Sequence, residues 1–332
     1  MITVRKLWEN SNITEECPSL SGKIRFDEPL RAHTTFKVGG PADIFAEPDS
    51  IESLVFLLDR CAVLDIPVSL LGGGSNVLVS DRGIRGLVVS LARFADISGP
   101  SVQSGDSLLV QAECGASMRD LTDWCQIRGI AGLERFAGLP GSVGGAVFMN
   151  ARCYDISMAD VFFSARVLYF QKGGCTLETW PLRREEWDYK TSPFQQRTGP
   201  DPLVLSPGAS VLLSAEFSLR TGDPLALRSE MDRWILDRTE KGHYRFPSAG
   251  SMFKNNRAFG MPSGKIIDEA GLRGFRIGDA QVAPWHGNIV INAGNATAAD
   301  LRALVRTVRG KVYDKTGFLL EPEVIQAGDW DE

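Results

Sequence analysis

Three consecutive glycines, Gly72 to Gly74, follow directly on an apolar run in the segment LLGGGSNVLVSDRG. A backbone without side chains can turn sharply and bring its N–H groups close to a phosphate or pyrophosphate. The G-x-G-x-x-G pattern of dinucleotide-binding folds is absent, because Val77 stands three residues after Gly74 and no helical pattern follows. From this segment alone, a phosphate-binding loop and a plain hairpin turn are both open interpretations.

A second glycine-rich run, Gly138 to Gly145, leads into the apolar residues AVFMN, which predicts that the loop opens a short helix. The first N–H groups of a helix are suited to bind an anion. Two such loops, in parts of the chain with different patterns, suit an extended cofactor that has a diphosphate in its middle.

Length and composition limit the class of protein. A chain of 332 residues predicts two or three domains. The formal net charge of -5 argues against nucleic acid as a main partner. The N-terminus lacks a long apolar segment and no run approaches the roughly 20 apolar residues that span a bilayer, so no membrane contact and a cytoplasmic location are expected. Six cysteines without a CxxC pair, and three histidines, give no metal-ligand spacing, and the cysteines are expected to be free thiols.

Periodicity predicts an α+β fold in three parts. Apolar residues at helical spacing predict helices over 51–64, 117–129, 225–241 and 297–317. We expect Asp49 with Glu52 to cap the first of these, and Thr297 with Asp300 to cap the last, which ends at Gly317. Strands are predicted near 66–71, 86–91, 107–115, 162–170, 210–219 and 318–324. The parts are residues 1–92, 93–221 and 222–332, and the last strand can return to the first part.

Two segments near the C-terminus could carry chemistry. In RFPSAGSMFKNN, a nucleophilic role for Ser251 has no support, since G-x-S-x-G is absent and no histidine belongs to a recognisable motif. A helix cap remains open, because serine is a favoured N-cap residue. In LLEPEV, Glu321 and Glu323 are two residues apart, hence on one face of a strand, either as an exposed polar face or as a carboxylate near a pocket.

Six segments taken in order resemble the motifs of the UDP-N-acetylenolpyruvoylglucosamine reductase family. They are HTTFKVGGPAD, LGGGSNVLVSDRG, GLERFAGLPGSVGGAVFMN, YKTSPF, PSAGSMFKN and LEPEV, and they cover the chain from His33 to Val324. The resemblance implies a two-subdomain FAD-binding fold like that of vanillyl-alcohol oxidase (the PCMH type), with residues 1–92 and 93–221 as the subdomains. Residues 222–332 would form an α+β substrate-binding domain.

The resemblance also implies a reaction and its partners. NADPH would reduce bound FAD, and hydride would then pass to the enolpyruvyl group of UDP-N-acetylglucosamine enolpyruvate, giving UDP-N-acetylmuramate for peptidoglycan synthesis. The cofactor carries the difficult chemistry in such enzymes. A monomer or a weak homo-oligomer is expected, with a small-molecule substrate as the partner.

Site residues follow from matching positions in the motifs. Ser251 matches the family's proton donor, and Glu323 matches its active-site glutamate. Lys190 stands in the YKTSPF segment as a third catalytic candidate, and the substrate would contact Tyr189, Lys241 and Asn255. The expected FAD contacts are Gly72, Gly73, Gly74, Ser75, Asn76, Gly138, Pro140, Gly141, Gly144, Gly145, Ala146 and Asn150.

The chain departs from the family pattern at two places. Lys190 stands where arginine is common, which keeps the charge but loses the bidentate fork for a carboxylate. The run Arg152 to Asp155 replaces a common Gly-Ala-Tyr-Gly run. The short connection before residue 225 indicates the shorter subgroup, which lacks an inserted tyrosine-bearing loop. Two alternatives remain, an FAD-dependent oxidase or dehydrogenase of the same superfamily and a catalytically impaired flavin-binding homologue.

Overall fold

A computed structural model describes residues 4–11, 13–20, 23–104, 106–171, 174–195, 203–206 and 208–330. Its helices are α1 (Val4–Glu9), α2 (Ile13–Glu16), α3 (Ile51–Val63), α4 (Met118–Ile127), α5 (Val143–Phe148), α6 (Pro224–Glu240), α7 (Ser263–Glu269) and α8 (Ala298–Thr316). Its strands are β1 (Ile24–Pro29), β2 (Pro41–Ala46), β3 (Val68–Leu71), β4 (Val77–Val79), β5 (Ile84–Ser90), β6 (Ile97–Ser104), β7 (Ser107–Glu113), β8 (Ile130–Ala131), β9 (Arg152–Cys153), β10 (Ile156–Ser157), β11 (Phe162–Gln171), β12 (Gly174–Pro181), β13 (Ser210–Thr221), β14 (Ser248–Ser251), β15 (Arg276–Ile277), β16 (Ala280–Val282), β17 (Ile289–Asn292) and β18 (Ile325–Ala327). The α+β class is confirmed. Across the described ranges, no helix combines the length and the apolar character that a membrane crossing needs.

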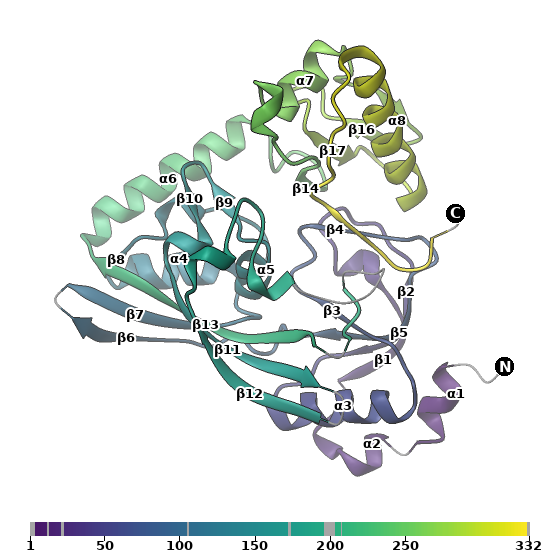
Figure 1. The fold of residues 1–332 in the computed structure, drawn as a ribbon, viewed down its shortest axis with the longest axis vertical. Coiled ribbons are helices and arrows are strands. Elements are labelled where there is room, and N and C mark those ends of the chain that lie inside the picture. The colour runs from purple at the N-terminus through teal and green to yellow at the C-terminus, as the bar shows by residue number, and fades with distance from the viewer. Residues whose placement is uncertain are drawn as a thin grey trace. The chain divides into compact units, whose positions relative to one another are not determined.

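The strands form three larger sheets and two small ones (Figure 1). One sheet has the order β1-β2-β5-β3, in which β3 and β5 run parallel. A second has the order β12-β11-β13-β7-β6 with antiparallel neighbours, and β8 also pairs with β13. The third has the order β14-β17-β16-β15, also antiparallel. β9 pairs with β10 as a hairpin, and β18 pairs with β4 in parallel.

The chain divides into two compact units. Unit 1 comprises Met1–Phe26, Ile44–Gly73 and Gly86–Leu236, and unit 2 comprises Asp27–Asp43, Gly74–Arg85 and Asp237–Glu332. The glycine loop at 72–74 therefore contributes to both units, with the division falling after Gly73. The three-part division at residues 92 and 221 remains a prediction.

Two hydrophobic cores lie among the described residues of unit 1. In one, α4 and α5 pack on the antiparallel sheet, with Leu121 and Val147 among the buried residues that meet Val110 and Phe217. In the other, α3 packs beside the strands that follow it. The predicted strands at 107–115, 162–170 and 210–219 are confirmed as β7, β11 and β13. Burying apolar side chains from both layers is the main stabilising contribution to such a unit.

The cap of α3 differs from the prediction. Ser50, and not Asp49, is the N-cap, and its hydroxyl accepts a hydrogen bond from the Ser53 N–H. The Asp49 carboxylate instead pairs with Lys23. The prediction that Asp49 caps α3 was therefore wrong. Ser50, the next residue, accepts the hydrogen bond at the helix N-terminus, while Asp49 binds a lysine from another segment.

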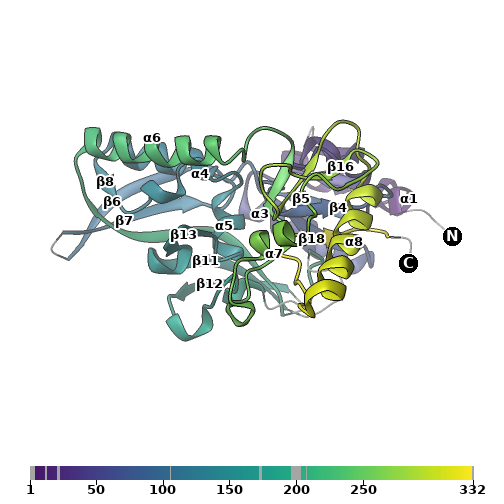
Figure 2. The ribbon, with the colours of Figure 1, turned by 90° about the horizontal axis from the view of Figure 1, so that it is seen from above.

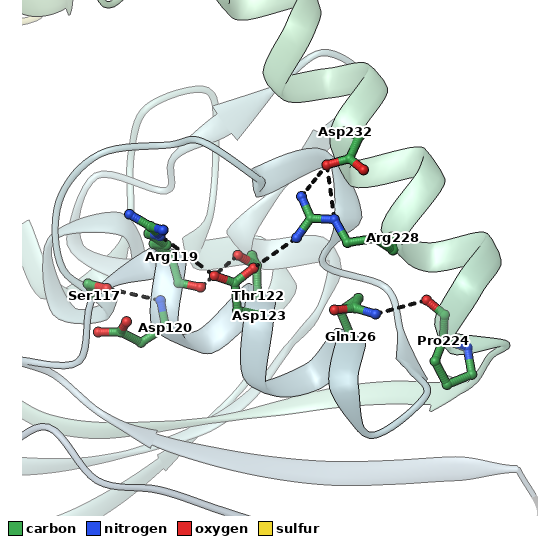
Figure 3. Close-up of polar contacts among 9 residues, drawn as sticks. All are labelled: Ser117, Arg119, Asp120, Thr122, Asp123, Gln126, Pro224, Arg228 and Asp232. Atoms are coloured by element: carbon green, nitrogen blue, oxygen red, sulfur yellow. Dashed lines mark hydrogen bonds and ion pairs between the residues drawn. The ribbon is translucent and has the colours of Figure 1, made fainter.

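Polar contacts fasten α6 along α4 within unit 1, and Figures 1 and 2 both show the two helices side by side. Figure 3 shows the contacts: Arg228 on α6 reaches Asp123 on α4 at 3.4 Å, and the Gln126 amide donates to the Pro224 carbonyl at 2.9 Å. Arg228 also binds Asp232 one turn along α6, which lowers the pKa of that carboxyl. These exposed ion pairs orient α6 more than they stabilise it.

In unit 2, α7 and α8 pack on the β14-β17-β16-β15 sheet, with Leu301, Leu304 and Val308 of α8 buried in the core. The predicted cap of α8 is confirmed: Thr297 and Asp300 form a capping box, and Gly317 ends the helix at a φ of 74°. Asp81 adds a further cap that the sequence did not indicate. Its two carboxylate oxygens accept hydrogen bonds from the Ala298 and Ala299 N–H groups, both at 2.8 Å.

The predicted strand at 318–324 was wrong. The segment is irregular, and the last strand is β18, which starts at Ile325. Pro322 interrupts the pairing because proline has no N–H to donate, and a single bridge joins it to Phe253. The glutamates of LEPEV thus lie on a connecting segment and not on one face of a regular strand.

We expect Asp81→Asn to destabilise unit 2 by about 1 kcal/mol, because an amide oxygen can serve only one of the two helix N–H groups and the charge near the helix N-terminus is lost. Urea denaturation followed by circular dichroism would measure the change. Asp314→Asn removes an exposed carboxylate elsewhere on α8 and is the control. An unchanged midpoint for Asp81→Asn would contradict the assigned cap.

Candidate active site

The two predicted glycine loops meet within unit 1. The Gly73 N–H donates to the Ser142 hydroxyl at 3.3 Å, and the Gly145 N–H donates to the same oxygen at 3.3 Å. A Cβ at Gly73 would lie 2.7 Å from the Gly141 Cα, closer than such atoms approach. The approach of the loops therefore requires glycine at position 73.

Ser142 was missed by the sequence analysis. It is the N-cap of α5, and its hydroxyl joins that helix to the first glycine loop. The signal that could have found it is a serine directly before the predicted helix, a favoured cap position.

The remaining residues of the second loop lie close by on the same segment. Gly138 has a φ of 75°, and Pro140 follows it in the loop that leads into α5. Gly144 packs against β7, where an added Cβ would lie 2.8 Å from the Cys114 Cβ. Ala146 is buried in α5. The structure thus brings together the predicted contacts from Gly72, Gly73 and the Gly138–Ala146 segment.

The Asn150 side chain forms hydrogen bonds within unit 1. Its side-chain nitrogen donates to the Asp188 carbonyl at 2.8 Å, and its oxygen accepts from the Ala159 N–H at 3.0 Å. Asp188 pairs with Thr191 across a tight turn that carries Tyr189 and Lys190, with Lys190 at a φ of 59°. Asn150 therefore holds the turn that presents two of the predicted site residues, and its predicted flavin contact remains a prediction.

The Arg152–Asp155 departure forms the β9–β10 hairpin. Tyr154 has a φ of 59°, and its ring lies 4.1 Å from the Trp234 ring between centroids. Arg135 forms an ion pair with Asp155. Tyrosine is also common at the position of Tyr154, so the contact with Trp234 does not depend on the departure. The ion pair with Arg135 does depend on it, because a glycine in place of Asp155 could not form it.

In unit 2, Ser251 is the last residue of β14 and is exposed, which excludes the open alternative that it caps a helix. Gly250 before it has a φ of 70°, and the pairing of β14 with β17 shifts register between Ser248 and Ser251. A Cβ at Gly250 would meet no heavy atom within 4 Å, so the conformation, and not space, requires glycine there. This irregularity sets the direction of the Ser251 side chain.

Ser251 and Glu323 lie on neighbouring backbone segments. The Glu323 N–H donates to the carbonyl of Met252, the residue after the serine, at 2.8 Å. The Lys254 N–H donates to the Glu321 carbonyl at 2.8 Å, and their side chains pair at 2.6 Å. The segments FKN and LEPEV are thus paired through their backbones. The Glu321 carboxylate forms an ion pair with Lys254, whereas the Glu323 side chain is half-buried.

Asn76 holds the other side of the Glu323 segment. Its side-chain nitrogen donates to the Glu323 carbonyl at 3.2 Å, and its own carbonyl accepts from the Ile325 N–H at 3.0 Å. Gly74, before it in the same unit, accepts from the Thr35 N–H at 3.1 Å. Within unit 2, residues Gly74 to Asn76 therefore lie beside the glutamate segment.

Lys241 and Asn255 also belong to unit 2. The Lys241 ammonium is 2.7 Å from the Asp237 carboxylate on the preceding turn, and the Asn255 side-chain oxygen accepts from the Ser263 N–H at 2.9 Å. Both side chains are exposed. The grouping of these two residues with Ser251 and Glu323 remains a prediction.

A pair of histidines lies beyond Lys241. The ring centroids of His243 and His286 are 6.2 Å apart. Burial, with nearby Arg238 and His286, lowers the pKa of His243 to about 4, and burial also lowers that of His286. Both imidazoles are therefore neutral at neutral pH.

All six cysteines are free, as expected. Burial raises the pKa of Cys61, Cys114 and Cys125 to about 12, so these thiols stay protonated and unreactive. Within the described ranges, no three His, Cys, Asp or Glu residues are grouped as metal ligands.

The fold and these loops define an FAD-binding oxidoreductase with a distinct C-terminal domain. The FAD binding domain model matches residues 42–176, and the model of the UDP-N-acetylenolpyruvoylglucosamine reductase C-terminal domain matches residues 242–326. The chain belongs to the UDP-N-acetylenolpyruvoylglucosamine reductase family, the flavoenzymes that act in peptidoglycan precursor synthesis.

Relatives with that name match nearly the full chain. The one from Treponema denticola is 46% identical over 93% of this chain and 95% of its own length, and the one from Treponema pallidum is 44% identical over 92% and 94%. The crystal structure of UDP-N-acetylenolpyruvylglucosamine reductase from Thermus caldophilus has a TM-score of 0.69 at 29% identity, covering 92% of this chain and 98% of that one. The two-subdomain FAD-binding fold with a C-terminal domain is confirmed.

We expect Gly73→Ala to reduce the FAD content of the purified protein, because the added methyl group would clash with backbone atoms of Gly141 and Ser142. The ratio of visible to ultraviolet absorbance measures FAD content. Gly310→Ala, in α8, meets no heavy atom within 4 Å and should retain the cofactor while stabilising the helix by about 0.5–1 kcal/mol. Equal FAD content in both variants would contradict the required close approach.

We expect the protein to lose stability as pH falls from 6.5 toward 4. An unfolded chain protonates His243 near its ordinary pKa of 6.5, whereas the folded protein protonates it only near 4, so the unfolded state binds more protons in this window. Thermal unfolding at a series of pH values measures the effect. In His243→Gln the dependence should become shallower, and an unchanged slope would show that other groups cause it.

Proposed function

We propose that the chain catalyses the NADPH-dependent reduction of UDP-N-acetylglucosamine enolpyruvate to UDP-N-acetylmuramate, with a proton supplied by Ser251. The observation that carries this proposal is the pairing of the segments around the serine and the glutamate. Glu323 donates from its N–H to the residue that follows Ser251. The reaction would take place in the cytoplasm with a small-molecule substrate as its partner.

The two glycine loops would hold the cofactor. Gly72 and Gly73 approach the Gly141–Gly145 loop, and no side chain at Gly73 fits between the two. The Gly73 and Gly145 N–H groups already donate to Ser142, so the diphosphate is proposed to bind other main-chain N–H groups of these two loops. Bound FAD would supply hydride, taken from NADPH, to C3 of the enolpyruvyl group.

Addition of hydride to C3 moves negative charge onto the substrate carboxylate, so the site must stabilise an enolate-like anion and protonate C2. Ser251 is proposed as the proton donor to C2. A serine hydroxyl is a weak acid in water, so it needs charged neighbours and the exclusion of solvent to serve. Glu323, on the adjacent segment, is the proposed charged neighbour that orients the substrate and the hydroxyl.

Lys190 is proposed to bind the carboxylate that gains charge. Its ammonium is a point charge, whereas an arginine would offer a planar pair of donors. The turn that carries it is held by Asn150 through the Asp188 carbonyl, which limits where the ammonium can reach. Tyr189 in the same turn is the proposed neighbouring substrate contact.

The nucleotide end of the substrate is proposed to lie near Lys241 and Asn255. A lysine ammonium suits a diphosphate, and the Lys241 side chain is exposed. Asn255, four residues after Ser251, is exposed and is the second proposed contact at this end of the substrate.

We expect Ser251→Ala to be reduced by NADPH at the normal rate but to return hydride to the enolpyruvyl substrate about 10²–10⁴-fold more slowly, since general acid catalysis is lost. The flavin absorbance band, followed under anaerobic conditions, should bleach with NADPH and return with substrate. Ser248→Ala, at the start of the same strand, is the matched control and should keep both rates. Normal return of the band in Ser251→Ala would remove the proton-donor role, and no return in the unaltered protein would refute the substrate.

A further inference from the structure

We infer that Asn288 is a positioning residue that sets the relative placement of Ser251 and Glu323. Its side chain forms two hydrogen bonds to one residue: the Phe253 N–H donates to its oxygen at 2.9 Å, and its nitrogen donates to the Phe253 carbonyl at 2.8 Å. An amide that binds both backbone groups of a residue fixes that residue as a neighbouring strand would. The inference rests on the proposed function, since it assigns a purpose to this geometry.

The backbone of Asn288 holds the next residue toward the serine. Its carbonyl accepts from the Met252 N–H at 2.8 Å, and the Met252 carbonyl in turn accepts from the Glu323 N–H at 2.8 Å. Met252 is thus fixed on one side by Asn288 and on the other by the glutamate segment. Because Met252 and Phe253 directly follow Ser251, three hydrogen bonds from one asparagine define where the strand carrying the serine ends.

Asn288 is itself rigidly placed. Its exposed fraction is 4%, and its N–H donates to Nδ1 of His286 at 3.1 Å in the turn that leads into β17. The Phe253 side chain is also buried, at 1% exposure. A buried amide whose donor and acceptor are both satisfied rigidifies its surroundings, whereas removal of one partner leaves buried polar groups unpaired.

Positioning of this kind matters because the proposed proton transfer depends on distance. A shift of about 1 Å in a reacting group can slow catalysis by roughly 100-fold. Without the Asn288 amide, the Phe253 N–H and carbonyl must find other partners, and the segment after Ser251 moves. Asn288 does not need to touch the substrate for this effect.

The chain offers a matched control in Asn292. It is buried to a similar degree, at 5% exposure, and lies at the end of β17 in the same unit. Its side chain also forms several hydrogen bonds: it donates to the Phe36 carbonyl at 3.2 Å and accepts from the Gly294 and Ala296 N–H groups at 3.1 and 3.0 Å. None of these partners belongs to the segments around Ser251 or Glu323.

The test measures the two half-reactions separately in Asn288→Ala and Asn292→Ala, each purified with FAD. We expect NADPH to bleach the flavin at the normal rate in both. With UDP-N-acetylglucosamine enolpyruvate, return of the band should slow by about 100-fold in Asn288→Ala and remain within about threefold of normal in Asn292→Ala. Equal slowing in both variants, or equal slowing of both half-reactions in Asn288→Ala, would overturn the inference in favour of a general loss of structure.

A second variant keeps the test decisive if Asn288→Ala folds poorly. In Asn288→Asp, a protonated carboxyl can accept from the Phe253 N–H and donate to its carbonyl, whereas the ionised form repels that carbonyl. Return of the band should therefore recover as pH falls, relative to the pH profile of the unaltered protein. Because His243, His286, Glu323 and the Lys254–Glu321 pair are present in both proteins, the comparison cancels their contributions. A pH profile of Asn288→Asp that runs parallel to that of the unaltered protein would overturn the inference.

The outcomes also separate this inference from the proposed function. If the unaltered protein fails to return the band with the enolpyruvyl substrate, the proposed function fails. If the unaltered protein and Asn292→Ala both react normally and Asn288→Ala does as well, the function stands and the positioning role is refuted.

Discussion

The approach of two backbones with no side chain between them is the constraint on which unit 1 depends. Gly73 lies so close to Gly141 that a methyl group would displace main-chain atoms, and Ser142 joins both loops through one oxygen. The N-terminus of α5, which packs on the antiparallel sheet, then lies beside the first glycine loop. A second close approach adds to this constraint, since a Cβ at Gly144 would lie 2.8 Å from the Cys114 Cβ.

Much of this architecture could be predicted from the sequence because local patterns and tertiary packing agree. The α8 helix has its capping box, apolar stripe and terminal glycine in one continuous segment, and all three are confirmed. The predicted strands that became β7 and β13 lie in the interior of their sheet, where apolar residues must repeat. By contrast, β6 (ISGPSVQS) was missed, since it is an edge strand and can carry proline and polar residues.

The candidate site residues also differ in whether a local sequence pattern marks them. Glycines and the serine motif could be found because each is a short pattern, and the family resemblance added roles to them. Asn288 and Asp81 could not be found, because each acts on residues far along the chain. Asn288 belongs to no local motif, and nothing in the segment LGGGSNVLVSDRG indicates that its aspartate caps a distant helix. Asn288 binds Phe253, and Asp81 binds the start of α8 at Ala298. Contacts of this kind leave no periodic trace in a single sequence.

The composition of unit 2 has a consequence for how the protein is made. Its residues come from 27–43, 74–85 and 237–332, and β4 must pair with β18, whose last residue is Ala327. Contacts of such high sequence separation form slowly and only after the intervening chain exists. During synthesis, unit 1 has its full complement of residues once Leu236 has emerged, whereas Val77–Val79 cannot pair until Ile325–Ala327 have been made. Unit 1 can therefore fold during synthesis while the proposed proton-transfer segments are still to be assembled.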